Sequence, residues 1–359
     1  MSVIKVNKME STGTTAGGVE VDSSGHVQVD GVQMPTAGAL SHRNLVVNGD
    51  CRVAQRTTAS QSHSSAGSVF GVDRFYAYAT QASKVTVQQN QASVTPPVGF
   101  QKYLGITSSS AYTSLSTDVF SFGQVIEAQN AAQLAWGTAD ARTITLSFWV
   151  RSSLTGTHSG AIMNGSFNRS YPYSYTISSA DTWEYKTITV LGDTSGTWDM
   201  AGNGKFAYII WDYGTGSDKR GTAGAWTGSH KEGVTGAVQL VGTSGATWYI
   251  TGIQLEVGEK ATPFENRSYG DELAKCQRYY QDGTYFQTDG NGPMTVHFIR
   301  EMRAAPTMSV TASTAITGSA AGTAHYTGVS TGNTTTEFTI YNPGGSGVIG
   351  CSYTATAEL

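Results

Sequence analysis

The run TITLSFWV, at residues 143–150, alternates polar and apolar side chains along its length. Ile144, Leu146 and Phe148 therefore share one face, which is the pattern of a strand with one buried and one solvated side. The run WEYKTITV, at residues 183–190, interleaves its side chains in the same way. Long strands of this kind, in a chain without long helical patterns, favour a β-sandwich or a jelly roll.

The composition of the whole chain supports β structure. Only 13% of the 359 residues are charged, against roughly 25% in an ordinary soluble domain. Helices usually display Glu, Lys and Arg on their solvated faces, so this chain cannot cover many helices. Polar, Gly-rich chains can also be disordered, but this one sets aromatic and β-branched residues in strand-like runs. The sequence therefore predicts an all-β protein.

Further candidate strands recur at short intervals, with turn residues between them. In the first three quarters of the chain they lie at 74–78, 84–88, 103–107, 120–126, 142–151, 173–177, 183–190, 205–212 and 248–257. After residue 280 they lie at 284–287, 294–298, 307–311, 337–341 and 348–354. Short helical segments are expected at 127–135 and at 269–280, where Asp271 is placed to cap the helix.

These patterns predict four parts. They are an N-terminal arm at 1–43, a jelly-roll domain at 44–266, a short helical link at 267–280 and a smaller C-terminal β domain at 281–359; the family resemblance given below implies virion attachment or oligomerisation for the arm and a carbohydrate-binding-like module for 44–266. In the arm, GVEVDSSGHVQVDG at 18–31 contains two short V-x-V strands. Two such strands cannot bury a core alone, so either the arm is stabilised by contacts with other chains or it is a flexible segment. The small residues late in the chain favour packing against neighbouring chains.

Several classes of partner are not expected. The formal net charge is −4 and no basic block is present, so nucleic-acid binding has no electrostatic basis. No apolar run approaches the roughly 20 residues of a membrane span, and the N-terminus lacks the apolar core of a signal peptide. Synthesis in the host cytoplasm is therefore expected.

Cys51, Cys276 and Cys351 are odd in number and widely spaced, which predicts buried free thiols rather than disulfides or a zinc site.

The sequence offers no catalytic constellation. It contains no G-x-S-x-G elbow, and its seven histidines are scattered without a metal-binding spacing. Glycan-degrading enzymes use paired carboxylates, whereas the acidic residues here lie mainly in turns. Asp212, between Trp211 and Tyr213, is the most site-like of them, and a turn acid at a strand end is the alternative. We expect no enzyme, no cofactor and no metal.

The sequence is more consistent with sugar binding than with catalysis. Sugars are held by aromatic faces together with a few polar groups, and these gather in the loop-like stretches at 168–173 and 211–220 and at the nearby Trp226. Packing against loops or against a neighbouring subunit is the alternative reading of these aromatics. Trp136, Trp149, Trp183 and Trp248 are expected in the core. The candidate glycan contacts are Tyr171, Tyr173, Trp211, Asp212, Tyr213 and Trp226.

A set of motifs resembles a known family. They are NLVVNGD at 44–50, QR at 55–56, VDRF at 72–75, LSFWVR at 146–151, YITGIQLEVG at 249–258, ATPFE at 261–265 and CQRYY at 276–280. Together they resemble bacteriophage and prophage tail-fibre proteins that carry a jelly-roll module similar to carbohydrate-binding modules. The resemblance covers residues 44–312, and it implies a virion location, oligomerisation and contact with the host surface. Such modules often hold calcium through acidic residues of the last strand, but ITGI at 250–253 has none.

The leading hypothesis is therefore a non-catalytic tail fibre or receptor-binding subunit, a homotrimer in the virion. Its N-terminal arm would attach to other tail proteins, and its β domains would contact host cell-surface polysaccharide. The alternative is a head fibre, a capsid decoration protein or another structural virion protein without receptor binding. A glycan-degrading enzyme is the third hypothesis.

Overall fold

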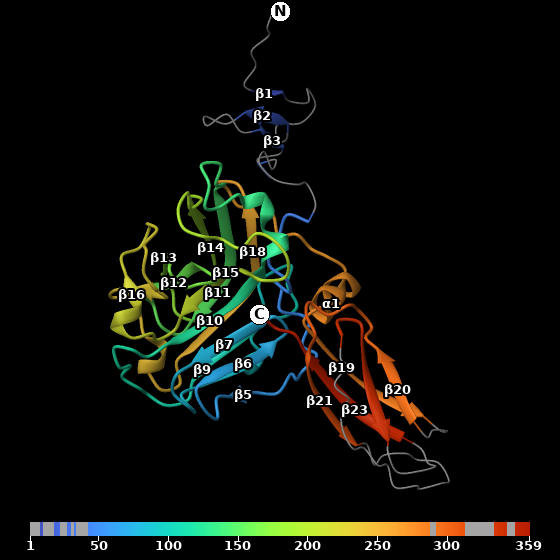
Figure 1. Cartoon of the computed structure of the whole chain (residues 1–359). Coiled ribbons are helices and arrows are strands. Elements are labelled where there is room, and N and C mark those ends of the chain that lie inside the picture. Colours follow the sequence, from blue (N-terminus) through green and yellow to red (C-terminus); the bar gives the residue numbers. More distant parts are fainter. Residues whose placement is uncertain are drawn as a thin grey trace, which may run out of the picture.

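A computed structural model of the chain describes residues 8–9, 18–21, 27–29, 32–33, 42–287, 292–312, 334–342 and 349–359. In these ranges strands dominate, and the one α-helix is short. The prediction of an all-β protein is therefore confirmed. The described part has no helix that is long and apolar enough to cross a membrane. Figure 1 shows the N-terminal strands above a large sandwich, with a smaller group of strands beside it.

The sandwich consists of two six-stranded antiparallel sheets. The first, here called the front sheet, has the order β13(Ser170–Ile177), β12(Gly156–Asn164), β15(Lys205–Asp212), β10(Phe120–Glu127), β7(Phe75–Ala79), β6(Gly67–Val72). The back sheet has the order β14(Glu184–Val190), β11(Ile144–Ser152), β18(Thr247–Val257), β9(Leu104–Ser108), β8(Val85–Gln89), β5(Gln61–Ser62). Non-consecutive neighbours such as β15 and β10 mean that the chain crosses repeatedly between the sheets, as a jelly roll requires.

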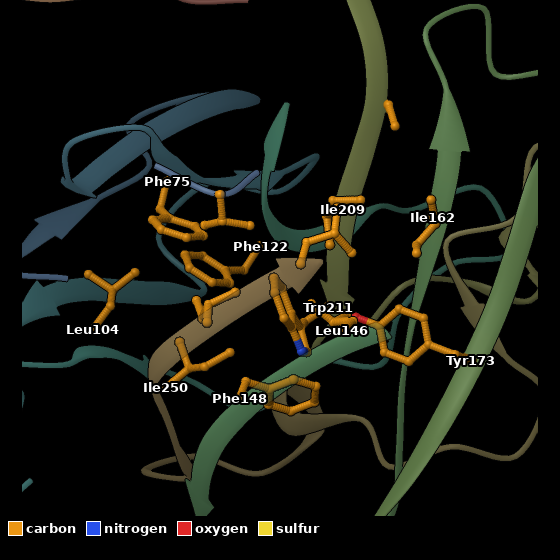
Figure 2. Packing of buried hydrophobic residues seen from close by; sticks show 14 of the residues in the cluster. Phe75, Leu104, Phe122, Leu146, Phe148, Ile162, Tyr173, Ile209, Trp211 and Ile250 are labelled. Carbon is orange, nitrogen blue, oxygen red and sulfur yellow. The ribbon is translucent and has the colours of Figure 1, made fainter. Parts of the chain in front are cut away.

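The core lies between these two sheets. Ile144, Leu146 and Phe148 of β11 are fully buried in it, as the alternation predicts. Aromatic rings from both sheets meet at its centre (Figure 2), where the ring of Trp211 lies 5.7 Å from Phe122 and 5.3 Å from Phe148. Trp136 and Trp248 are also buried, as expected. Trp149 and Trp183 are only half-buried, so their assignment to the core is wrong.

The prediction of a helix at 127–135 is also wrong. This stretch forms two single 3-10 turns, η2(Ala128–Asn130) and η3(Ala132–Leu134). The amides of Ala131 and Leu134 each bond a carbonyl three residues earlier, and Ala135 is left-handed with φ 50°. The chain turns here from the front sheet to the back sheet, which leaves no room for a continuous α-helix. Three further single 3-10 turns are η1(Gln91–Ser93), η4(Ser217–Lys219) and η5(Leu240–Gly242).

The remaining elements flank the sandwich. The N-terminal strands form one sheet in the order β1(Lys8–Met9), β2(Val19–Val21), β3(Val27–Val29), β4(Val32–Gln33). After the sandwich come the helix α1(Tyr269–Gln277) and two small sheets, β19(Tyr280–Gln287)-β23(Ile349–Thr356)-β21(Thr307–Ala312) and β20(Gly292–His297)-β22(Glu337–Asn342). Ser268 caps α1 by accepting from the amide of Asp271, so Asp271 itself is not the cap.

The C-terminal sheets have a core of their own. Phe298, Phe338 and Tyr353 pack together in it, with ring centroids 4.8 Å apart for the last two. The region of small residues at 313–333, expected to pack against neighbouring chains, lies outside the described residues. Cys51 and Cys276 are buried free thiols, as predicted, and burial raises the pKa of Cys276 well above its ordinary value. The side chain of Cys351 lies outside the described part.

Charged residues join the C-terminal sheets to the sandwich. Arg278 contacts Glu127 of the front sheet at 2.6 Å, and the Tyr279 hydroxyl donates to the same carboxylate at 2.7 Å. Glu358 pairs with Arg56 at 3.0 Å and also with Arg74. The Arg74 guanidinium lies 3.5 Å from the centre of the Tyr279 ring. Buried, hydrogen-bonded pairs of this kind hold two units in one geometry, and we call this set of residues the junction.

The junction predicts a pH-dependent stability that Glu127→Gln should reduce. Burial tends to raise the pKa of Glu127, but hydrogen bonds from Arg278 and Tyr279 outweigh it and hold the pKa below its ordinary value. The charged form therefore stabilises the fold above the unfolded pKa of about 4.3, and this contribution is lost as the pH falls through the lowered folded pKa. We expect the variant to lose about 1.5–3 kcal/mol at pH 7.

Thermal unfolding at pH 7 and at pH 3 measures this effect. The gap in stability between the two pH values should be smaller in Glu127→Gln than in the unchanged protein. Glu259→Gln is the matched control because Glu259 is exposed on the sandwich. Equal gaps in all three proteins would show that Glu127 does not link the two units.

Candidate functional site

The structure places four of the six predicted glycan contacts in the interior. Tyr173, Trp211, Asp212 and Tyr213 are each at most 3% exposed. Figure 2 shows Trp211 and Tyr173 among the core side chains, and the Tyr173 hydroxyl donates to the carbonyl of Ile210 at 2.8 Å. Tyr173, Trp211 and Tyr213 pack in the core between the two sheets, and Asp212 is buried on the outer side of the front sheet, so none of them can reach a sugar and the prediction is wrong for these four residues. Trp211 and Asp212 end β15 and Tyr173 belongs to β13, as the candidate strands at 205–212 and 173–177 predict, so the loop interpretation of these positions is wrong.

The other two predicted contacts do meet. The rings of Tyr171 and Trp226 lie 5.3 Å apart, and both side chains are half-buried. Trp226 also contacts Trp136 and Trp198, at 5.2 Å and 5.5 Å, and its indole N–H donates to the carbonyl of Leu191. Contacts with buried tryptophans on two sides favour a packing role for this pair.

Asp212 has a structural partner. It lies on the outer side of the front sheet beneath the loop at 214–238, where its carboxylate pairs with Arg220 at 2.9 Å. It also accepts from the amides of Gly214 and Thr215 at 2.8 Å and 2.7 Å. Burial raises its pKa, and Arg220 opposes that rise. Arg220 in turn donates to the carbonyl of Ala237, so the pair fixes both ends of the loop to the sheet.

Beside this loop, the outer side of the front sheet has an open groove of about 420 Å³. Its floor includes Met163, which belongs to a buried apolar cluster with Val125, Ala161, Tyr208 and Ile210. We call the cavity the front groove, and its lining side chains are Ser68, Phe70, Tyr76, Tyr78, Val119, Ser121, Met163, Phe167, Lys205, Tyr208, His230, Glu232 and Leu359. Aromatic rings and a few polar groups converging on one hollow are the usual composition of a ligand site.

Three rings form one wall of the front groove. Phe167 lies 4.7 Å from Tyr208 and 4.7 Å from His230, nearly parallel to the latter. Phe167 is 36% exposed and has a left-handed backbone with φ 57°. Asn164 holds this turn, since its side-chain oxygen accepts from the amides of Asn168 and Arg169 at 3.1 Å. A bulky residue in this conformation costs free energy and often marks a functional position.

Polar groups line the rest of the wall. The Lys219 ammonium contacts Nδ1 of His230 at 3.0 Å, and Nε2 of His230 lies 2.8 Å from Glu232. An ammonium group cannot accept a hydrogen bond. Nδ1 therefore carries the lone pair, and Nε2–H donates to Glu232. Burial, together with Glu232, raises the pKa of Tyr76 well above its ordinary value, so its hydroxyl is neutral.

This arrangement is suited to binding. Glu232 is the single Asp or Glu among the residues lining the front groove, and it is already bonded to His230, whereas hydrolysis of glycosidic bonds usually uses a pair of Asp or Glu side chains. Within the described ranges, no group of three or more His, Cys, Asp or Glu side chains is placed to hold a metal ion.

The front groove was missed from the sequence, although a signal for it exists. In β7 the core residues Phe75, Ala77 and Ala79 alternate with Tyr76 and Tyr78, which face outward. In β15 the outward Tyr208 alternates with the buried Ile209 in the same way. These two strands flank β10 in the sheet. Aromatic residues at outward positions of strands this close together are unusual for a purely solvated face, and this pattern predicts a binding surface.

No family model and no curated protein matches the chain. Among solved structures, it is similar to the enzymatically active domain of tailspike protein 4 of bacteriophage CBA120, at 13% identity and a TM-score of 0.32. That match covers 60% of this chain and 21% of the tailspike chain, so this chain spans about a fifth of that protein's length. It is also similar to a family 11 carbohydrate-binding module of a cellulase of Clostridium thermocellum, at 15% identity and a TM-score of 0.28, covering 55% of this chain and 99% of the module. At these scores neither comparison bears on what this chain binds.

Proposed function

We propose that this chain is a non-catalytic glycan-binding subunit and that the front groove is its binding site. The observation that carries this is the wall of Tyr208, Phe167 and His230, with ring centroids 4.7 Å apart, above an apolar floor. Sugar rings bind well to such walls because their C–H faces are apolar while their hydroxyl groups reach polar side chains at the rim. The presence of one Asp or Glu side chain in the groove lining, rather than a pair, supports binding rather than glycan hydrolysis.

Phe167→Gly is the sharpest test of this proposal. Glycine accepts a left-handed backbone without cost. The free energy of unfolding of the variant should therefore be unchanged or higher by up to about 1 kcal/mol. It also removes one ring of the wall, and glycan affinity should fall at least tenfold, which is about 1.4 kcal/mol. Opposite changes in stability and affinity are expected of a residue kept for binding.

The measurements are thermal unfolding and binding to a panel of bacterial surface polysaccharides and oligosaccharides. Tyr185→Ala is the matched control, because Tyr185 is a 43% exposed aromatic residue of the back sheet. It should leave glycan affinity unchanged. If the full chain binds no glycan of the panel or of host cells, or if Phe167→Gly binds as well as the unchanged protein, the front groove is not a glycan site.

We further propose that the chain acts in a phage virion, as a receptor-binding or tail-fibre subunit. The motifs at 44–50, 249–258 and 276–280 and a glycan-binding groove support this role. Micrographs of particles labelled with antibody to the chain should show label on the tail, and the antibody should block adsorption to host cells. Label on the capsid with undiminished adsorption would favour the alternative, a structural virion protein without receptor binding.

A further inference from the structure

The front groove has a cation without a carboxylate partner. Lys205, at the start of β15, is exposed and lines the groove. Its ammonium donates to the Tyr208 hydroxyl at 2.9 Å and lies 5.5 Å from the centre of the Tyr208 ring. Over the described ranges, no Asp or Glu oxygen lies within ion-pair distance of it. Lys205 is thus held against the aromatic wall by a neutral group.

The nearest acidic residues already have partners. Glu127 lies opposite Lys205 on the neighbouring β10, but its carboxylate oxygens accept from Arg278 and Tyr279 at the junction. Glu232 accepts from His230, which is bonded in turn to the Lys219 ammonium. The negative charge of Glu232 is therefore balanced within the wall by Lys219. Lys205 is therefore the lining cation that no Asp or Glu side chain of the described residues neutralises.

From this charge distribution we infer that the front groove selects a glycan bearing a carboxylate, such as a uronic or sialic acid residue. This rests on the proposed function and adds the chemical class of the ligand. A sugar ring stacked on Phe167 and Tyr208 would direct an equatorial carboxylate to the rim, where the Lys205 ammonium is anchored. In a groove lined by aromatic rings, an ammonium that is partly shielded from water attracts a carboxylate more strongly than one on an open surface.

Matched ligands test this inference directly. The full chain is titrated with acidic polysaccharides, namely polygalacturonate, alginate, hyaluronan and polysialate, and with each of them after chemical reduction of its carboxyl groups to alcohols. At least one acidic polymer should bind, and its reduction should weaken binding tenfold or more. Binding of that polymer should also weaken as salt is raised, because the ion pair lies at the rim of an open groove and is only partly shielded from solvent ions.

Lys205→Met supplies the second half of the test. The variant keeps the length of the side chain but loses the charge, so its affinity for the acidic polymer should fall to that for the reduced one. Lys186→Met is the control, because Lys186 lies on the back sheet and pairs with Glu184. It should behave as the unchanged protein.

The outcomes separate this inference from the proposed function. Binding of neutral glycans that Phe167→Gly abolishes and Lys205→Met leaves intact would overturn the acidic-sugar inference alone. If Lys205→Met weakens the binding of the acidic polymer and of its reduced form by the same factor, the acidic-sugar inference is also overturned, since the charge of Lys205 would then play no part. Failure of every glycan to bind would overturn both. Binding of sulfated but not carboxylated polymers would show that the cation serves a different anion.

Discussion

Replacing Asp212 with alanine should lower the free energy of unfolding by about 3–5 kcal/mol. Asp212 is 3% exposed, and its removal leaves the buried guanidinium of Arg220 without a counter-charge. It also leaves the amides of Gly214 and Thr215 without acceptors. Chemical denaturation, followed by the fluorescence of the core tryptophans, measures the loss.

Two variants make this result specific. Asp218→Ala removes an exposed acid from the same loop and should change stability by no more than about 0.5 kcal/mol. The double variant Asp212→Asn with Arg220→Met should lose less than Asp212→Ala, because no unpaired charge stays buried. Since the pair fixes the loop that carries His230 and Glu232, Asp212→Ala should also weaken glycan binding. A stable Asp212→Ala protein that has lost only binding would instead make Asp212 a direct ligand contact.

Trp211→Ala should cost a similar amount, about 3–5 kcal/mol. The indole is 1% exposed and contacts aromatic residues of both sheets, so its loss opens a large cavity between them. The loss comes from the volume of the cavity and not from a lost polar contact. Trp211→Phe, which fills most of that volume, should therefore keep most of the stability that Trp211→Ala loses. Denaturant midpoints of the two variants give the comparison.

Trp183, the residue immediately before β14 of the back sheet, provides the control for this prediction. Trp183 is half-buried, and its indole N–H donates to the carbonyl of Thr95 at the surface. Trp183→Ala should therefore lose clearly less stability than Trp211→Ala. Comparable losses at the two positions would mean that the centre of the sandwich does not depend on Trp211. Should Trp211→Ala fail to fold, the ranking of Trp211→Phe against Trp183→Ala still decides the point.

Local alternation predicted most strands of the sandwich but missed β5, β6 and β12. The segment Gly156–Asn164 is rich in Gly, Ser and Thr and reads as a loop. Its small residues are required by its neighbours, since a Cβ on Gly160 would lie 2.1 Å from the carbonyl oxygen of Ile210 and 2.5 Å from the Tyr173 hydroxyl. The strand thus exists because β13 and β15 approach it closely, and such long-range contacts leave no periodic signal in the segment itself.

The candidate site could be predicted only in part, for a related reason. Aromatic residues beside glycines suggested surface loops, yet Tyr173, Trp211 and Tyr213 are buried by strands and turns that are distant in the sequence. The residues of the front groove come from five strands, from the connections between strands and from Leu359, and no single segment shows them together. The motifs at 55–56, 72–75 and 276–280 are far apart in the sequence, and only the structure shows that their residues contact one another. Arg56, Arg74, Arg278 and Tyr279 all belong to the junction.

The junction ends inside the front groove. Glu358 is held by Arg56 and Arg74, and the next residue, Leu359, packs on the apolar floor beside Met163 and Tyr208. In Figure 1 the chain accordingly returns from the C-terminal strands to the sandwich. Tension that separates these two parts acts on the three arginine–glutamate pairs of the junction and on the contact of Leu359 with the apolar cluster. A mechanical pull on the C-terminal strands should therefore widen the groove, and the affinity for the proposed glycan ligand should then depend on the force applied.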